Sequence, residues 1–442
     1  MDGEVGRFRF MLHEAVAASG EVVLSSEAYF PTRRPREWHK TRGFREEALC
    51  LQATRGSYRD SAAQLNRTRR QWQGGTPVNT LQDSAQKEGT AVLEFLGRQS
   101  AAILERQGFE EHGQPSAAWA SKVADNTYTD LSSEQVEQAL ERLGEPMRMR
   151  GFSAAQIEQV KVQARCGVYE DPAHCTNVAI DDIAVKKQKG HRERPPVLQS
   201  EAGGAAASAA PPAGASGANR PKVANTVARL ERATQRFTLT GIGVVRTLQF
   251  VLGFLLNNEL LGARIHIFTD GYKGLQNAIS AFFAWHPGVR LLLDWYHLVK
   301  KFKEDLSLGC RGRAIRNRHL RALLPLLWYG LVEEARRYLS EIALAELKDP
   351  SAIERLRTYL QRNTSAIPCY ALRSQLGLRN SSGPVESANN ELTARRQKRN
   401  GMSWSEQGSR ALTALSMVVS NRAHESWVRE HRFPLEFVDK AA

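Results

Sequence analysis

Two aspartates stand directly after short apolar runs, where β-strands would end. Asp270 follows the run 264–269, and Asp294 follows the aliphatic run Val289–Leu293. Residues 272–285 between them have apolar side chains at helical spacing, so we expect a strand–helix–strand crossover with parallel strands. Open α/β sheets carry their chemistry at the carboxyl ends of parallel strands. The two aspartates are therefore predicted to lie at one such edge.

Further carboxylates extend this pair into a candidate metal site. Residues 177–186 (NVAIDDIAVK) have the pattern of a strand and contain the adjacent residues Asp181 and Asp182, and Glu386 follows much later in the chain. Phosphodiester chemistry with two Mg²⁺ ions needs several carboxylates that converge on metals about 3.5–4 Å apart. One ion would activate the attacking water or 3′-hydroxyl, and the other would stabilise the leaving oxygen. We predict Asp270, Glu386 and one of the two adjacent aspartates as ligands, and the choice between those two stays open.

Each carboxylate also has a simpler interpretation. Asp270 precedes a glycine, and Asp-Gly is a strong turn dipeptide. The two adjacent aspartates could be charges at a strand edge, although a carboxylate in an apolar strand is costly unless it is paired or bound to a metal. Glu386 would occupy a preferred capping position if Gly383 were the N-cap and Pro384 the first helical residue. The order of the surrounding elements favours the catalytic interpretation.

The motif Asp294-Trp295-Tyr296-His297 joins a predicted strand to a predicted helix. Asp294 and His297, three residues apart, could coordinate a metal or orient a substrate phosphate. Alternatively, Asp294 caps the helix while the aromatic pair packs into the core, and physical considerations alone favour this second interpretation.

Basic residues cluster in two helices near these motifs. A helix predicted over 391–400 follows Glu386, and another follows Asp294. Their cations would bind the DNA backbone on either side of the cut, or they would simply form solvated helix faces. The predicted DNA contacts are Arg395, Arg396, Lys398, Arg399, Lys300 and Lys301.

The order of predicted elements from residue 177 onward is β-β-β-α-β-α-β-α, with the first three strands joined as hairpins and the later ones by crossovers. This is the order of a ribonuclease-H-like α/β fold, with a helical insertion before Glu386 and a mainly α-helical DNA-binding region before the core. The predicted regions are a basic arm (1–50), a helix-turn-helix-like region (51–110), a helical spacer (111–175), a catalytic core (176–299) with an Ala/Gly/Pro/Ser-rich loop (195–221), a helical insertion (300–380) and a final catalytic helix with C-terminal helices (381–442).

The helix-turn-helix-like region is predicted from two helical patterns around a polar break. Thr76 and Pro77 look like an N-cap and first helical residue of a second helix that exposes polar side chains. The connection before them is longer than a standard turn, and a plain helical hairpin is the alternative. The spacer contains no recognisable chemistry, and we interpret it as a link between domains or an oligomerisation surface.

Composition points to a polyanionic partner. The chain has 442 residues and a formal net charge of +14, which favours nucleic acid, although a merely basic protein would show the same balance. The five cysteines are scattered without a C-x-x-C pair, as expected in a reducing compartment, and give no zinc or disulfide signature. No apolar run reaches transmembrane length, and the N-terminus lacks the pattern of a signal peptide, so we expect a cytoplasmic protein with no membrane partner.

Three motifs in fixed order resemble a known family. FTDGYKGLQNAI, LLLDWYHLVKK and GPVESANNELTARRQKRNGMSWS look like the catalytic half of DDE transposases of bacterial insertion sequences. The closest group is the Mutator-related one, whose members carry a C- or D-x-x-H signature. The resemblance covers residue 177 to the C-terminus. It implies that Asp181, Asp270 and Glu386 are the catalytic triad, with Asp182 standing where relatives often have glycine, and that Asp294 and His297 form the signature pair.

The resemblance also implies an activity. A DDE transposase would hydrolyse a phosphodiester at each transposon end and transfer the strand to target DNA, with two Mg²⁺ or Mn²⁺ ions held by the acidic residues. Its partners would be double-stranded DNA, as terminal inverted repeats and as target, and further copies of itself, in the bacterial cytoplasm at the nucleoid. Three alternatives remain: a nuclease or resolvase on the same fold that cuts without strand transfer, a catalytically silent DNA-binding protein derived from a transposase, and a basic helical scaffold.

Overall fold

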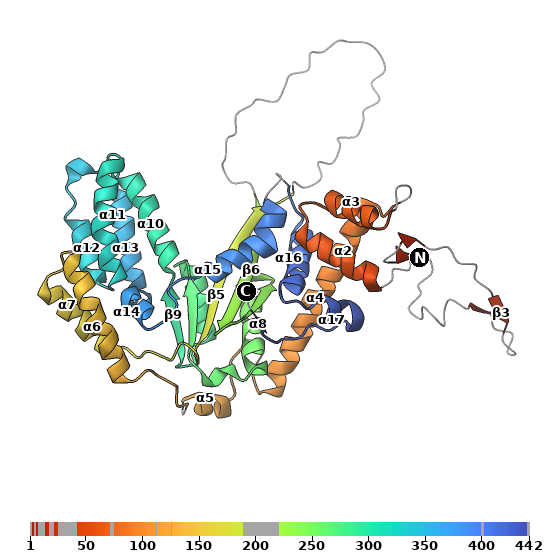
Figure 1. The fold of residues 1–442 in the computed structure, drawn as a ribbon, viewed down its shortest axis with the longest axis horizontal. Helices are drawn as coiled ribbons and strands as arrows, with labels where there is room; N and C mark the ends of the chain where they lie inside the picture. Colours follow the sequence, from red (N-terminus) through yellow and green to blue (C-terminus); the bar gives the residue numbers. More distant parts are fainter. Residues whose placement is uncertain are drawn as a thin grey trace, which may run out of the picture.

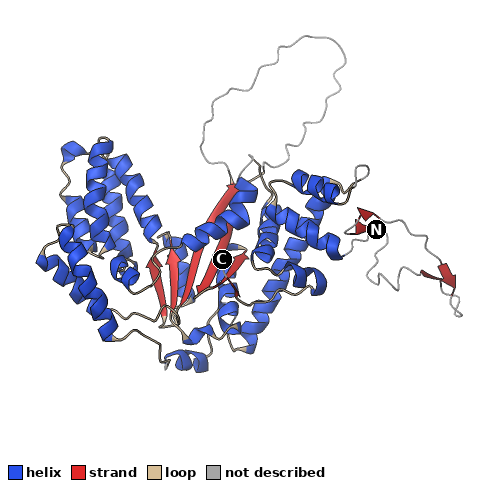
Figure 2. Ribbon diagram, viewed as in Figure 1, coloured by secondary structure: helices blue, strands red, loops and turns tan. Residues whose placement is uncertain are grey.

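The computed structural model describes residues 42–70, 75–110, 113–124, 126–188, 221–398 and 402–439, together with the short strands Asp2–Gly3, Gly6–Arg7, Glu14–Val16 and Val22–Leu24. A mixed β-sheet stands at the centre, with one group of helices on each side (Figure 1). Figure 2 shows the same arrangement by element type, with the sheet in red between the two helical groups. The Ala/Gly/Pro/Ser-rich loop and most of the predicted basic arm lie outside the described residues.

The sheet has six strands in the order β10-β7-β6-β5-β8-β9. The strands are β5 (Thr176–Lys186), β6 (Lys222–Arg232), β7 (Gln235–Gly241), β8 (Ile265–Thr269), β9 (Val289–Leu293) and β10 (Val438–Asp439). The first three form an antiparallel meander, and β8 and β9 continue the sheet in parallel with β5. The predicted meander and the parallel crossover are both present, so the mixed α/β class is confirmed.

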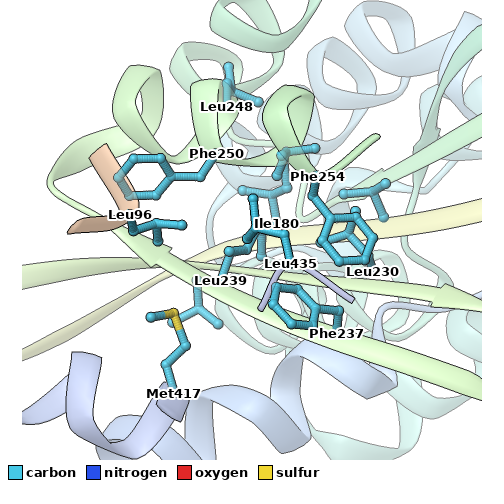
Figure 3. Close-up of a cluster of buried hydrophobic side chains, with 14 of the residues drawn as sticks. Leu96, Ile180, Leu230, Phe237, Leu239, Leu248, Phe250, Phe254, Met417 and Leu435 are labelled. Atoms are coloured by element: carbon cyan, nitrogen blue, oxygen red, sulfur yellow. The ribbon is translucent and has the colours of Figure 1, made fainter. Parts of the chain in front are cut away.

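Apolar side chains on both faces explain why this sheet is central. All five residues of β8 are buried, as expected for a parallel strand covered on both sides. Helix α8 (Gly243–Asn257) covers one face with Phe250 and Phe254, and α16 (Glu406–Ser420) covers the other with Met417 (Figure 3). The crossovers are completed by α9 (Lys273–Phe282) between β8 and β9.

The predicted insertion is helical and packs around its own apolar core. It contains α10 (Trp295–Gly309), α11 (Arg313–Trp328), α12 (Val332–Ser340), α13 (Pro350–Asn363) and α14 (Tyr370–Gln375). The predicted spacer forms α5 (Ala117–Ala124), α6 (Ser133–Met149) and α7 (Ala154–Arg165). Leu140 and Met147 of α6 share a buried cluster with Leu331 and Leu372. Helices α6 and α7 are therefore part of the same helical group as the insertion (Figure 1).

The N-terminal helices differ from the sequence-based expectation in three ways. Helix α2 (Arg42–Thr54) begins inside the predicted arm, and it packs with α3 (Tyr58–Thr68) and α4 (Val78–Arg106). Pro77 itself is the N-cap of α4, one residue later than predicted. The separate helical patterns over 78–88 and 90–107 predict two helices, but the structure has one continuous helix, α4. Gly89 permits α4 to lie against α16, because a Cβ there would come within 2.1 Å of the Ala411 carbonyl oxygen.

The remaining helices follow the insertion. They are α15 (Gly383–Asn389), the π-helix Asn390–Lys398 that continues it, α16, and α17 (His424–Glu430). Within the described residues, no helix combines the length and apolar character needed to cross a bilayer.

Candidate functional site

Strand register brings the predicted aspartates to one edge of the sheet. In the parallel pair β5–β8, Ala179 lies opposite Phe268, so Asp181 and Asp270 are each two residues beyond the same rung. In the pair β8–β9, the last rung joins Thr269 to Leu293. Asp270 and Asp294 therefore leave neighbouring strands side by side, as the crossover predicts.

Helix α15 brings Glu386 to these aspartates. Burial, followed by the negative charges of Asp270 and Glu386, raises the pKa of Asp181 to about 6. Because Asp181 responds to the charges of Asp270 and Glu386, the three carboxylates lie within electrostatic range of one another in a partly desolvated place. Residues from β5, from the turn after β8 and from a helix more than a hundred residues later thus form one group. We call Asp181, Asp270 and Glu386 the acidic site.

The two adjacent aspartates of β5 have different environments. The Asn389 side chain donates a hydrogen bond of 2.7 Å to Oδ2 of Asp181. Asp182 lies opposite Thr226 in the ladder and accepts a 2.6 Å hydrogen bond from that hydroxyl. Successive side chains of a strand point to opposite faces, so Asp182 points away from Asp270 and Glu386. Asp181 is the member of the pair that belongs to the acidic site, and Asp182, predicted as the alternative ligand, lies outside it.

Asp294 is a fully buried helix cap. Its Oδ1 accepts the backbone N–H of His297 at 3.0 Å, and its Oδ2 accepts the backbone N–H of Ser382. Ser382 is the N-cap of α15, so one carboxylate connects the start of α10 with the start of α15. Since each oxygen already accepts a backbone hydrogen bond, the geometry favours a positioning role for Asp294, with metal coordination left as a prediction.

His297 bonds directly to Glu386. Its Nε2 is 2.9 Å from Oε1 of Glu386, whose side chain is 43% exposed. Burial disfavours the charged imidazole, but the hydrogen bond to Glu386 and the charges of Asp294 and Asp181 outweigh it and raise the pKa of His297. The same hydrogen bond lowers the pKa of Glu386. Both shifts favour the charged forms of the pair.

The capping interpretation of Glu386 is wrong. Ser382, and not Gly383, is the N-cap of α15, which moves Glu386 one position beyond the predicted third helical residue. Its carboxylate bonds to His297 of another helix. The side chain is thus directed into the acidic site.

Two residues of the site were missed by sequence reasoning. Asn389 lies three residues after Glu386, one helical turn on, and this spacing could have indicated a shared face. The hydroxyl of Tyr359, in α13, donates a 3.3 Å hydrogen bond to the Asp270 carbonyl. It also closes over Gly271, whose φ of +87° suits glycine and where a Cβ would lie 2.5 Å from the Tyr359 hydroxyl. No local pattern connects residues 270 and 359.

Arg396 is a correction to the predicted DNA contacts. It is 1% exposed, and its guanidinium donates hydrogen bonds to the carbonyls of Gln52 and Gly56. It also lies over the rings of Tyr58 and Trp404. This arginine joins the π-helix to the N-terminal helices and has no face left for a phosphate.

The other predicted cations have mixed placements. Lys300, Arg395 and Lys398 are exposed, and the charges of Lys300 and Lys398 contribute to the lowered pKa of Glu386, so both lie near the acidic site. Lys301 is paired with Asp305 at 2.8 Å. Arg399 lies outside the described residues.

A second cluster of titratable side chains lies at the opposite end of β5 and β8. Glu170, Cys175 and His266 are buried, their ligand atoms lie within 4.8 Å of one another, and they could hold a metal ion. His266 Nε2 is 2.6 Å from Glu170 Oε1, and Arg373 Nη2 is 3.3 Å from His266 Nδ1. We call these four residues the basal cluster. Sequence reasoning missed it because its members come from three separate segments.

The arrangement of Arg373 favours ion pairing over metal binding in the basal cluster. A guanidinium is always a donor, so Nδ1 of His266 accepts and the proton of the neutral ring lies on Nε2, facing Glu170. Burial raises the pKa of Cys175 to about 11, so its thiol is protonated at neutral pH. A metal would have to displace both protons.

In the acidic site, in contrast, one of the three carboxylates pairs with an imidazole, and the site is open to solvent through Glu386. Carboxylate oxygens are the ligands that Mg²⁺ and Mn²⁺ prefer, so the residues present fit such ions. No protein-family model matches the chain, and no curated protein matches it either.

Proposed function

We propose that the protein is a DDE-type DNA transposase whose acidic site cleaves and joins DNA strands. The observation that carries this proposal is the convergence of Asp181, Asp270 and Glu386 from three separate elements. Together they would hold two Mg²⁺ or Mn²⁺ ions, which would activate the attacking oxygen and stabilise the leaving one. The raised pKa of Asp181 supports this role, because divalent cations would offset the burial and the negative charges that raise it.

We further propose that the catalytic domain is ribonuclease-H-like. The first and fourth strands of the core, β5 and β8, lie side by side, as that fold requires if aspartates on each are to share a site. The antiparallel meander followed by two parallel crossovers supports the same assignment. The helices of residues 295–375 would be an insertion between β9 and the helix that carries Glu386.

The reaction would proceed in two steps at one site. In the first, a water oxygen attacks the phosphorus at the transposon end, the bond from phosphorus to the 3′ oxygen breaks, and a 3′-hydroxyl and a 5′-phosphate result. In the second, that 3′-hydroxyl attacks a phosphorus of the target, whose own 3′ oxygen leaves. One phosphodiester is made for each one broken in the second step, so no ATP is needed.

Neighbouring residues would orient the three carboxylates. Asn389 fixes one oxygen of Asp181 through its 2.7 Å hydrogen bond. His297 pairs with Glu386. Asp294 accepts backbone hydrogen bonds from His297 in α10 and from Ser382, the N-cap of α15, and so connects the two helices that carry this pair. Lys300 and Lys398, exposed near Glu386, would contact the DNA backbone beside the cut.

DNA recognition would lie in the N-terminal helices. Helices α3 and α4 pack with α2 around Leu65 and Leu81, and the start of α4 exposes Asn79, Gln82 and Asp83. We propose that this helix-turn-helix-like unit reads the terminal inverted repeats and that copies of the chain pair the two ends in the bacterial cytoplasm. The net charge of +14 supports a nucleic-acid partner.

The test uses DNA that contains the chain's own coding sequence with its flanks, because a transposase acts on the element that encodes it. We expect Mg²⁺- or Mn²⁺-dependent breaks with 3′-hydroxyls at fixed flanking positions, and joined products with added target DNA. Asp181→Asn and Asp270→Asn should lose about 10³-fold in rate, since several kcal/mol of charge stabilisation are at stake. Asp182→Asn is the matched control and should retain activity.

Other outcomes identify the alternatives. Breaks without joined products would indicate a nuclease or resolvase. If the wild-type protein binds DNA but is no more active than its Asp270→Asn variant, it is a catalytically silent DNA-binding protein. Affinity for DNA that does not fall with salt would contradict phosphate binding altogether.

A further inference from the structure

Two tyrosines are the exposed aromatic side chains of the described residues. Tyr272 is 64% exposed and Tyr296 is 56% exposed, while the other described tyrosine, tryptophan and phenylalanine side chains are buried or partly buried. Aromatic rings bury a large apolar area when they pack, so leaving two of them in water forgoes stabilisation. Their position in the fold indicates what they could bind.

The two tyrosines hold equivalent positions beside the acidic site. Tyr272 stands two residues after Asp270, and Tyr296 stands two residues after Asp294, at the ends of the paired strands β8 and β9. The backbone N–H of Tyr272 donates a 2.8 Å hydrogen bond to Asp270 Oδ1. The ring of Tyr296 lies edge-on to His297, 5.5 Å between centroids. Both tyrosines therefore stand next to residues of the site.

The ring of Tyr272 lies beside the start of α9. A Cβ on Gly274 would come within 2.8 Å of its Cε1, so the glycine leaves room for the ring at this place. The ring itself remains largely exposed.

Each tyrosine also has an exposed lysine close to it in the chain. Lys273 follows Tyr272 directly, and Lys300 lies four residues after Tyr296 on the same face of α10. A ring beside a cation suits a ligand that is flat and apolar on its faces and carries phosphate. Nucleobases of unpaired DNA have this combination, and base–aromatic stacking is tolerant of sequence.

We propose that Tyr272 and Tyr296 form a stacking site for unpaired nucleobases next to the scissile phosphate. The proposal rests on the proposed function and adds a property of the substrate: base pairs at the cleaved position are open in the complex. Bases inside a duplex have no free face, so an end that is already unpaired should bind more tightly than a fully paired one.

The experiment measures binding by the full chain of short duplexes with paired or three-nucleotide unpaired ends, each with 2-aminopurine at the end. No divalent ion is added, so no strand is cut. We expect tighter binding of the unpaired end and quenching of the fluorophore. Tyr272→Leu and Tyr296→Leu should each weaken that binding by about 5- to 100-fold, as loss of one stacked base does.

Matched variants separate stacking from other causes. Tyr272→Phe and Tyr296→Phe keep the ring and should behave as the wild type. The leucine variants should lose less affinity for the fully paired duplex than for the unpaired end, because opening the pairs offsets part of the stacking. Their thermal unfolding should match the wild type because both side chains are exposed. Equal losses on paired and unpaired DNA, or no loss on either, would overturn the stacking site.

Failure of this proposal is distinct from failure of the proposed function. If the protein cleaves the ends of its own element and the leucine variants bind as the wild type does, the stacking site is refuted and the transposase proposal stands. If quenching depends on both tyrosines but no metal condition gives cleavage, the stacking site is supported and the transposase proposal is refuted.

Discussion

The strands β5 and β8 have a cluster of charged side chains at each end, and the two clusters are built differently. At the carboxyl-terminal edge, Asp181 and Asp270 meet Glu386, and three carboxylates face one imidazole. At the other end, Glu170 lies beside His266, with the guanidinium of Arg373 4.0 Å from the carboxylate. The first cluster is open to solvent, while the second is buried and contains a guanidinium.

This difference distinguishes a cluster that stabilises the fold from a cluster that could carry out a reaction. A buried carboxylate close to a guanidinium can hold elements together, here α14 and β8 through Arg373, Glu170 and His266. A group of carboxylates in which burial and the neighbouring charges raise the pKa of one member, as they do for Asp181, is a candidate for a functional site. The same strands therefore carry the basal cluster, which connects elements of the fold, at one end and a candidate reaction site at the other.

The largest effect on stability should come from disrupting the basal cluster. Arg373→Met leaves the Glu170 carboxylate buried without its cation, so the free energy of unfolding should fall by about 3–5 kcal/mol. Asp181→Asn at the acidic site should cause no such loss, since it removes a repelled charge. Urea unfolding of both variants measures the contrast. Adding Glu170→Gln to Arg373→Met should restore part of the stability. Equal destabilisation by Arg373→Met and Asp181→Asn would contradict the difference between the basal cluster and the acidic site.

A smaller effect is expected from pH in the absence of divalent ions. The pKa of Asp181 is raised to about 6, so its protonated form is favoured by folding, and stability should rise as pH falls through 6 toward the ordinary value near 4. The raised pKa of His297 acts in the same direction, because its stabilisation is present at low pH and lost as pH rises.

Thermal unfolding between pH 5 and 8 measures this dependence. Asp181 should contribute about 1–2 kcal/mol, after allowance for its partial exposure. Asp181→Asn should flatten the curve, with Asp182→Asn as the matched control. Glu386, whose pKa is lowered, would reduce stability only at more acidic pH. A pH dependence that is unchanged in Asp181→Asn would contradict the raised pKa of Asp181.

The smallest effect concerns the connection between the helical insertion and the acidic site. Tyr359→Phe removes the hydrogen bond to the Asp270 carbonyl, which is long at 3.3 Å, and should cost about 0.5–1 kcal/mol in unfolding free energy. The ring would still cover Gly271, so Tyr359→Ala should cost more. If cleavage is established, the phenylalanine variant should slow it only a few-fold.

Local patterns account for what the sequence could predict. The alternation over 177–186 and the run Val289–Leu293 gave strands because burial imposes a period on neighbouring residues. The register then places Asp181 and Asp270 together without further information. Asp294 as a helix cap also followed from local chemistry, and the structure agrees with it.

Packing between distant segments could not be predicted in this way. Arg396 seemed to be a surface cation, but its burial depends on Tyr58 and Trp404 coming together around it. The basal cluster depends on Arg373 folding back over β8, and no periodicity links residues 266 and 373. The choice between Asp181 and Asp182 needed the neighbours of each, Asn389 and Thr226.

The most direct measurement counts the Mn²⁺ ions bound per chain by electron paramagnetic resonance, with a DNA end present. The proposed function predicts two ions for the wild type and for Asp182→Asn, and the loss of at least one for Asp181→Asn and for Asp270→Asn. Glu170→Gln, in the basal cluster, should leave the count unchanged. An Asp181→Asn chain that binds as many Mn²⁺ ions as the wild type would contradict the assignment of the acidic site.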